Sequence, residues 1–161
     1  RMLEESSLRM VWEPMVRIIG EGLGAPVESV SVRVERRALE RDIDVPGMGR
    51  FEAGTQGAFR FEVMGFRGGE ARYVVEHITR IDDDCARDWP YPPEGRGCHR
   101  VVISGSPVLH VTVHGEDSHE PGPAGGGNAS AANRIVNLIP AVFAAAPGVL
   151  SPLDLPPLKR G

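Results

Sequence analysis

Cysteine and long apolar runs are both scarce in this sequence, and each shortage excludes a class of protein. Cys85 and Cys98 are the only cysteines among 161 residues, so no disulfide framework is expected; we expect two inert thiols, the alternative being one disulfide that closes the proline-rich loop between them. No stretch approaches the roughly 20 apolar residues of a membrane-spanning helix, and no signal segment precedes the first helical pattern. We therefore expect a cytoplasmic protein without a membrane partner.

Concentrated positive charge is also missing. The formal net charge is -4, and the most basic stretch, VERRALER, is interrupted by Glu35 and Glu40. This distribution argues against a nucleic-acid partner. The glycine-rich segment GPAGGGN matches neither G-x-G-x-x-G nor G-x-x-x-x-G-K-[ST], so we interpret it as a lid or connector. We expect this segment of protein to bind no nucleotide cofactor by itself.

Histidine is present, but not in a convincing metal-binding pattern. His110 and His114 lie four positions apart on an expected strand, which separates their side chains by about 13 Å, too far for one ion. The stretch HGEDSHE adds Glu116, Asp117 and His119, and a solvated acidic loop explains it. We expect no metal.

Glycine and proline are abundant, with 20 and 14 residues, which predicts long, defined loops. Apolar spacing predicts a helix over 3–23, which Pro14 either kinks or delays to a start near Glu13. Alternation predicts a strand in VESVSVRVERRAL, a long hairpin around RGGE, and a second strand pair around SGSP. A helix follows at 132–149. This order predicts one α+β domain over residues 1–161, with a single largely antiparallel (mixed) sheet and helices packed on one face.

Two candidate site residues lie in the long hairpin. Gly54 and Gly57 interrupt the start of a strand in EAGTQG, which indicates either a β-bulge or the close approach of a ligand, with Thr55 available to bind it. His77 shares a strand face with Tyr73 and Val75. It is either a hydrogen-bonded sheet residue or a substrate-binding group.

The last helix, ANRIVNLIPAVFAAAPGV, carries the other candidates. Asn128 or Ser130 can cap its start, and a stripe should be buried, formed by Ala132, Ile135, Ile139, Val142 and Phe143. Pro140 lacks an N–H group, which destabilises a helix least when the proline lies in the first turn of a helical segment. We therefore expect a break at 136–138, with a new helical segment after it.

Such a break would place three polar side chains together, Asn133, Arg134 and Asn137. They could hold an anionic or amino-acid-like ligand in a pocket wall. Alternatively, the two amides only satisfy the backbone groups that the break frees.

A family resemblance rests on two long stretches. NRIVNLIPAVFAAAPGVLSPLDLP resembles the C-terminal end of the NAD(P)-dependent 2,4-diaminopentanoate dehydrogenase family, whose members are often labelled dihydrodipicolinate reductase-like. The likeness extends upstream through FEAGTQGAFRFEVMGFRGGEARYVVEHITRIDDDCARDWPYPPEGRGCHRVVISGSP and covers most of the chain from about Phe51 onward.

The resemblance implies a dihydrodipicolinate reductase C-terminal-like fold and a role in a larger enzyme. In that family a Rossmann domain binds NAD or NADP, and the C-terminal α+β domain closes over a small-molecule substrate and forms a homo-oligomer. The chain then looks like this second domain without its N-terminal Rossmann domain. The reaction implied is reversible oxidative deamination at an amine-bearing carbon.

The resemblance assigns no catalytic residue here, and the lysine-bearing signature of true dihydrodipicolinate reductases is absent. The substrate-binding candidates Thr55, His77, Asn133, Arg134 and Asn137 rest on their own chemistry. A different class of function is a non-catalytic module in which the sheet grips the C-terminal helix around a small apolar ligand.

Overall fold

The structure is a computed structural model that describes residues 3–92, 97–116, 119 and 125–155. It divides into two compact units, Arg1–Pro90 and Tyr91–Gly161, which are described separately. That residues 1–161 act as one domain stays a prediction.

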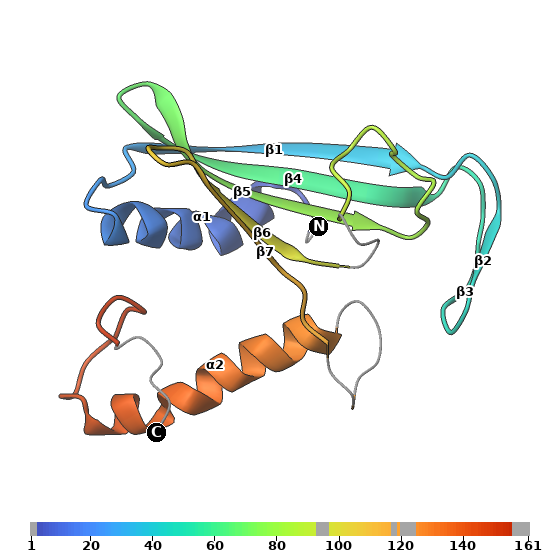
Figure 1. Ribbon diagram of the computed structural model, residues 1–161. Helices are drawn as coiled ribbons and strands as arrows, with labels where there is room; N and C mark the ends of the chain where they lie inside the picture. Colours follow the sequence, from blue (N-terminus) through green and yellow to red (C-terminus); the bar gives the residue numbers. More distant parts are fainter. Residues whose placement is uncertain (1–2, 93–96, 117–118, 120–124, 156–161) are drawn as a thin grey trace. The chain divides into compact units, whose positions relative to one another are not determined.

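The first unit combines one helix with a three-stranded sheet (Figure 1). Helix α1 (Glu5–Gly22) is followed by β1 (Ser29–Ala38), β4 (Gln56–Arg67) and β5 (Glu70–Arg80), all antiparallel in the order β1-β4-β5. Between β1 and β4 the chain forms a separate short hairpin, β2 (Ile43–Val45) with β3 (Gly49–Phe51).

The second unit holds a further strand pair and a helix. Strand β6 (His99–Ile103) pairs antiparallel with β7 (Leu109–Val113), and α2 spans Gly125–Ala144. The predicted α+β class and the antiparallel pairings are confirmed. The described strands nevertheless form three sheets, not the single sheet expected, because the short hairpin pairs only with itself and β6–β7 belongs to the second unit.

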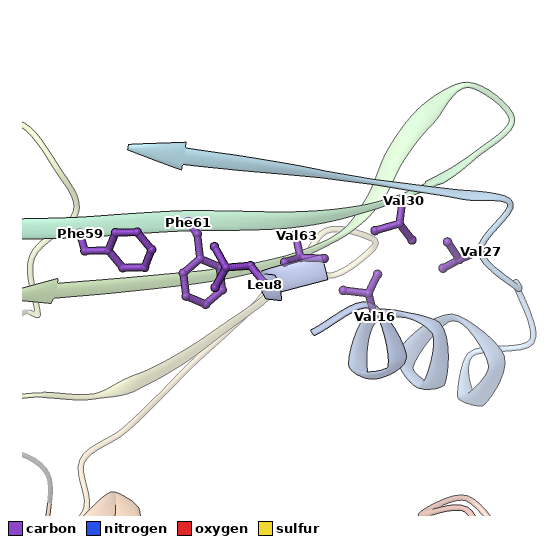
Figure 2. Packing of buried hydrophobic residues seen from close by; sticks show 7 residues of the cluster. All are labelled: Leu8, Val16, Val27, Val30, Phe59, Phe61 and Val63. Atoms are coloured by element: carbon purple, nitrogen blue, oxygen red, sulfur yellow. The ribbon is translucent and has the colours of Figure 1, made fainter. Parts of the chain in front are cut away.

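The core of the first unit lies between α1 and one face of the sheet (Figure 2). Alternation turns Val30, Phe61 and Val63 towards the helix, as predicted, and Val16 of α1 meets them with no exposed surface. Burial of each such side chain contributes about 1.5–3 kcal/mol. Gly65 permits this close approach, since a Cβ there would lie 2.5 Å from Val16 Cγ1.

Helix α1 runs unbroken through Pro14, so the alternative start near Glu13 is wrong. The carbonyl that loses its partner belongs to Met10, which is 74% exposed and can face water. The Glu13 carboxylate also accepts hydrogen bonds from Arg9 (2.7 Å) and Arg17 (2.8 Å), one turn to either side. These pairs tie together the turns around the proline.

The long hairpin is confirmed. Gly68 and Gly69 connect β4 to β5 with φ of 60° and 80°, the left-handed conformation that two-residue hairpin turns require. At the other end of β4 the register with β1 shifts between Arg37 and Ala38, which leaves Gly57 as an extra residue. The bulge interpretation of EAGTQG is therefore correct.

Helix α2 departs from the prediction in its start and in its continuity. It begins at Gly125, so Ser130 lies inside it and donates to the Gly126 carbonyl (2.7 Å) instead of capping its start. The predicted break at 136–138 is wrong, because the helix continues through Pro140 to Ala144. Since Val136 is 58% exposed, its freed carbonyl can be hydrated.

The predicted buried stripe on α2 is wrong as well. Its large members Ile135, Ile139, Val142 and Phe143 are between 49% and 91% exposed, and in the described part of the second unit no strand packs on the helix. Of the helices described, neither has the combination of length and apolarity that crossing a bilayer requires.

Candidate functional site

His77 lies on the sheet face that α1 covers, near the middle of β5. Its ring stacks on Phe61 across the ladder, with centroids 5.2 Å apart, and Trp12 of α1 lies 6.2 Å away. The imidazole Nε2 is 2.7 Å from Thr79 Oγ1. Partial burial lowers the pKa of His77 below its ordinary value, because it disfavours the charged form. The result is a neutral imidazole near pH 7, held at a fixed tilt by aromatic rings.

Thr55 lies in the turn that precedes β4, and the turn itself uses its polar groups. The hydroxyl donates to the Glu52 carbonyl (2.6 Å), and the Thr55 carbonyl accepts from Leu39 N–H (2.8 Å). Thr55 and Phe61, the partner of His77, are six positions apart, which on a strand corresponds to about 20 Å. Thr55 and His77 are therefore not brought together.

Asn133, Arg134 and Asn137 lie within little more than one turn of α2, in the second unit. The two amides share one face of the helix because they are four residues apart, and Arg134 adjoins them. Both asparagines are exposed and Arg134 is half-buried. An arginine can bind a carboxylate, and the oxygens of the two amides beside it can accept hydrogen bonds from an ammonium group. The substrate-binding role of these residues stays a prediction.

The sheet face opposite α1 carries an ion-pair network that the sequence analysis missed. Arg60 contacts Glu76 at 2.7 Å, Glu62 at 3.0 Å and Glu35 at 3.4 Å. These four side chains are only 17–27% exposed. The three carboxylates raise the pKa of Arg60 even though burial acts to lower it. Finding the network required the register of three strands, which no single stretch of sequence reveals.

The segment after β5 is fixed to the sheet by one arginine. Arg80 donates to the carbonyls of Cys85, Ala86, Trp89 and Pro90 at 3.0–3.1 Å. Trp89 is 3% exposed, and Arg37 Cζ lies over its ring, 5.0 Å from the ring centroid. This end of the sheet therefore has a defined loop structure.

Two open hollows lie at opposite ends of the first unit. One, of about 350 Å³, is bordered by Ala25, Glu28, Arg67, Gly68, Arg72 and Tyr73. The other, of about 360 Å³, is bordered by Arg41, Asp42, Ile43, Asp44, Val45, Pro46, Ile81 and Asp82. Neither contains a residue predicted for the substrate site.

Metal-binding residues do not cluster in the part of the chain that the structure describes, where no three of His, Cys, Asp and Glu could hold an ion together. Asp117, part of the HGEDSHE stretch, lies outside the described residues, as does 120–124 before the helical glycines.

Comparison with known proteins found one strongly similar sequence. A curated protein from Streptomyces virginiae is 46% identical over 156 residues, which are 96% of this chain and 43% of that protein. That relative is named amine dehydrogenase. The chain spans less than half of its length. No protein-family model matches the chain.

A solved structure is similar to this chain in its fold. The structure of amine dehydrogenase from Mycobacterium smegmatis is similar over 89% of this chain and 37% of its own, with a TM-score of 0.57. The two sequences are 20% identical over this match, so the likeness concerns the fold alone. The fold of this chain is thus similar to that of a part of that amine dehydrogenase.

Proposed function

We propose that this chain is the substrate-binding and oligomerisation part of an NAD(P)-dependent dehydrogenase that acts on the amine-bearing carbon of a small, amino-acid-like substrate. The carrying observation is the 46% identity to an amine dehydrogenase across nearly the whole chain. The fold shared with a second amine dehydrogenase supports it. The finer proposal is a 2,4-diaminopentanoate dehydrogenase-like enzyme with a dihydrodipicolinate reductase C-terminal-like fold, in the cytoplasm.

The nicotinamide cofactor does not fit the residues of this chain. Dinucleotides bind where a parallel strand meets a glycine-rich helix start, whereas the described strands pair only antiparallel and the sequence lacks G-x-G-x-x-G. We propose that another part of the complete enzyme binds NAD or NADP. The chain by itself is then inactive.

Each candidate residue would bind a different group of the substrate. Arg134 would pair with a carboxylate, and the amide oxygens of Asn133 and Asn137 would accept hydrogen bonds from an ammonium group. His77, whose pKa is lowered, would be neutral at pH 7 and able to accept a proton. Thr55 would contribute its hydroxyl only if it released Glu52.

The homo-oligomer would form through the sheet face opposite α1. Its centre carries Arg33 and Arg60 among Glu35, Glu62 and Glu76, so charges of both signs alternate across it. A surface of this kind can pair with a second copy of itself around a two-fold axis, because each arginine can meet a carboxylate of the partner.

The proposed function is tested with the complete enzyme. Purified protein is mixed with NAD⁺ or NADP⁺ and a panel of amines and diamino acids, and formation of reduced nicotinamide is followed by absorbance. The matched control panel replaces each amine by the corresponding alcohol. We expect reduction with amines alone, and carbonyl plus ammonia should reverse it. Reduction with the alcohols but not with the amines would refute the proposal.

The alternative, an apolar-ligand module, is supported by no specific observation. The two hollows described in the first unit are open and have charged side chains in their walls. An apolar ligand favours an enclosed, mostly apolar pocket.

A further inference from the structure

The imidazole of His77 has one hydrogen-bond partner among the residues that the structure describes, and that partner belongs to the same strand. His77 Nε2 lies 2.7 Å from Thr79 Oγ1, two positions further along β5. Residues two apart on a strand project from the same face of the sheet, so the strand itself keeps the two side chains side by side. The bond therefore depends on no contact from another element.

Two aromatic rings restrict how the imidazole can turn. Phe61 lies directly opposite His77 on β4, with 5.2 Å between the ring centroids and 22° between the ring planes. Trp12 of α1 lies 6.2 Å away, at 38° to the imidazole. A half-turn of the imidazole about its Cβ–Cγ bond would keep the stack but would place a carbon, Cε1, against the Thr79 hydroxyl. One orientation of the ring therefore satisfies both contacts.

The Thr79 hydroxyl can form this bond in two ways, because a hydroxyl group both donates and accepts. If the hydroxyl donates, Nε2 carries no proton, and the neutral imidazole has its proton on Nδ1. If the hydroxyl accepts, Nε2 carries the proton and Nδ1 is the bare nitrogen. The direction of this one bond therefore decides which nitrogen of His77 can take up a second proton.

Only the second arrangement keeps its bond when the imidazole becomes charged. An imidazolium donates from both nitrogens, so Nε2–H would still donate to the Thr79 oxygen. In the first arrangement, a proton that arrives at Nε2 would break the bond, and the hydroxyl would have to turn. A proton acceptor in a reaction works best among partners that need no such rearrangement.

We propose that Thr79 is a positioning residue that holds His77 as the Nε2–H tautomer, so that Nδ1 is the atom that takes a proton from the substrate's ammonium group. This inference rests on the proposed function, in which His77 accepts a proton. In this step one N–H bond of the ammonium group breaks and an Nδ1–H bond forms, which leaves a neutral amine and an imidazolium. Thr79 itself exchanges no proton.

NMR of the complete enzyme, labelled with ¹⁵N at histidine, tests the tautomer directly. At about pH 8, where an ordinary histidine is neutral, two-bond correlations between ring protons and ring nitrogens distinguish Nε2–H from Nδ1–H. The signals that His77→Gln removes are those of His77. We expect Nε2–H in wild type and in Thr79→Ser, which keeps the hydroxyl. Thr79→Val has nearly the same shape without the hydroxyl, and it should show both tautomers in exchange.

Steady-state kinetics with an amine substrate test the consequence for the reaction. Thr79→Val should lower kcat about three- to tenfold and leave KM within about twofold, because proton transfer is affected and binding is not. Thr79→Ser should keep kcat within about twofold of wild type. The matched control is Thr112→Val, the same change at an exposed position of β7, which should alter neither kcat nor the His77 signals.

The proposal fails if wild-type His77 carries its proton on Nδ1, or if Thr79→Val keeps a single Nε2–H tautomer. It also fails if Thr79→Val turns over amines as wild type does, because His77 Nδ1 is then not the proton acceptor. All variants should fold, since Thr79 is exposed and valine favours strands. The tautomer is measured without turnover. A wild-type enzyme that turns over no amine would thus refute the proposed function and leave the tautomer result standing.

Discussion

His77 lies nearly parallel to Phe61 across the β4–β5 ladder, with 22° between their ring planes. The stack gives the imidazole a hydrophobic support on one side, and Trp12 lies 6.2 Å away, although His77 as a whole is an exposed residue. A histidine supported in this way keeps its orientation while its proton exchanges with water. Its protonation is therefore linked to the stability of the sheet.

That linkage predicts how stability responds to pH. The pKa of folded His77 is lowered from 6.5, so as the pH falls below about 6.5 the unfolded chain binds this proton first. The free energy of unfolding should therefore fall with pH, and His77→Gln should lose this component. Urea unfolding at intervals from pH 7.5 to 5 measures both proteins. Equal slopes in the two would contradict the prediction.

Gly57 predicts a steric effect at the bulge. A Cβ there would lie 2.5 Å from Leu39 Cδ2 and 2.8 Å from Cys85 Sγ, so Gly57→Ala should lower the free energy of unfolding by about 1–3 kcal/mol. Leu39→Ala in the same protein should reduce that cost, and Gly148→Ala, with nothing within 4 Å, should cost less than about 0.5 kcal/mol. Urea unfolding of the four variants gives the answer. A cost independent of Leu39 would show that the added methyl group does not clash with Leu39.

Arg60 predicts an electrostatic effect on stability. Arg60→Met leaves Glu35, Glu62 and Glu76 without their shared cation and should cost about 1–3 kcal/mol at pH 7. Glu62→Gln and Glu76→Gln in the same protein should reduce that cost, because fewer carboxylates are then left without a cation. Arg72→Met is the control, because its pair with Glu70 is 60% and 71% exposed and contributes about 0–1 kcal/mol. A cost that these two substitutions leave unchanged would show that Arg60 acts by packing alone.

Asn137 predicts a substrate effect in the complete enzyme. If its amide contacts the substrate, Asn137→Ala should raise KM for an amine substrate by about tenfold, the value of one lost hydrogen bond to a charged group. Asn128→Ala changes the same residue type on the same helix outside the candidate site. Steady-state kinetics of both variants make the comparison. If KM and kcat of Asn137→Ala equal those of Asn128→Ala, Asn137 is not a substrate ligand.

The strands could be predicted because alternation is local. In both β1 and β4, every second residue is apolar and lies on the face that packs on α1. These residues are Val30, Val32 and Val34 in β1 and Phe59, Phe61 and Val63 in β4. The turn at Gly68 and Gly69 likewise needs only its own two residues. Such features depend on neighbours along the chain.

The helices show what local patterns leave out. The sequence predicted interruptions at Pro14 and Pro140, yet both helices continue, and in each the residue whose carbonyl the proline frees is exposed. The Arg60 network and the Arg80 contacts depend on strand register and on a loop folding back, which alternation does not encode. Of the candidate site, sequence could predict which residues have suitable chemistry, but not their distances.

The hydrogen bonds from Arg80 have a mechanical consequence. The Arg80 guanidinium donates to the carbonyls of Trp89 and Pro90, the last residues of the first unit. Arg80 is also the last residue of β5. A pull on the chain beyond Pro90 is therefore carried directly into a strand of the sheet, so the load does not first extend the loop. Lysine, with its single ammonium group, could not spread that load over four carbonyls.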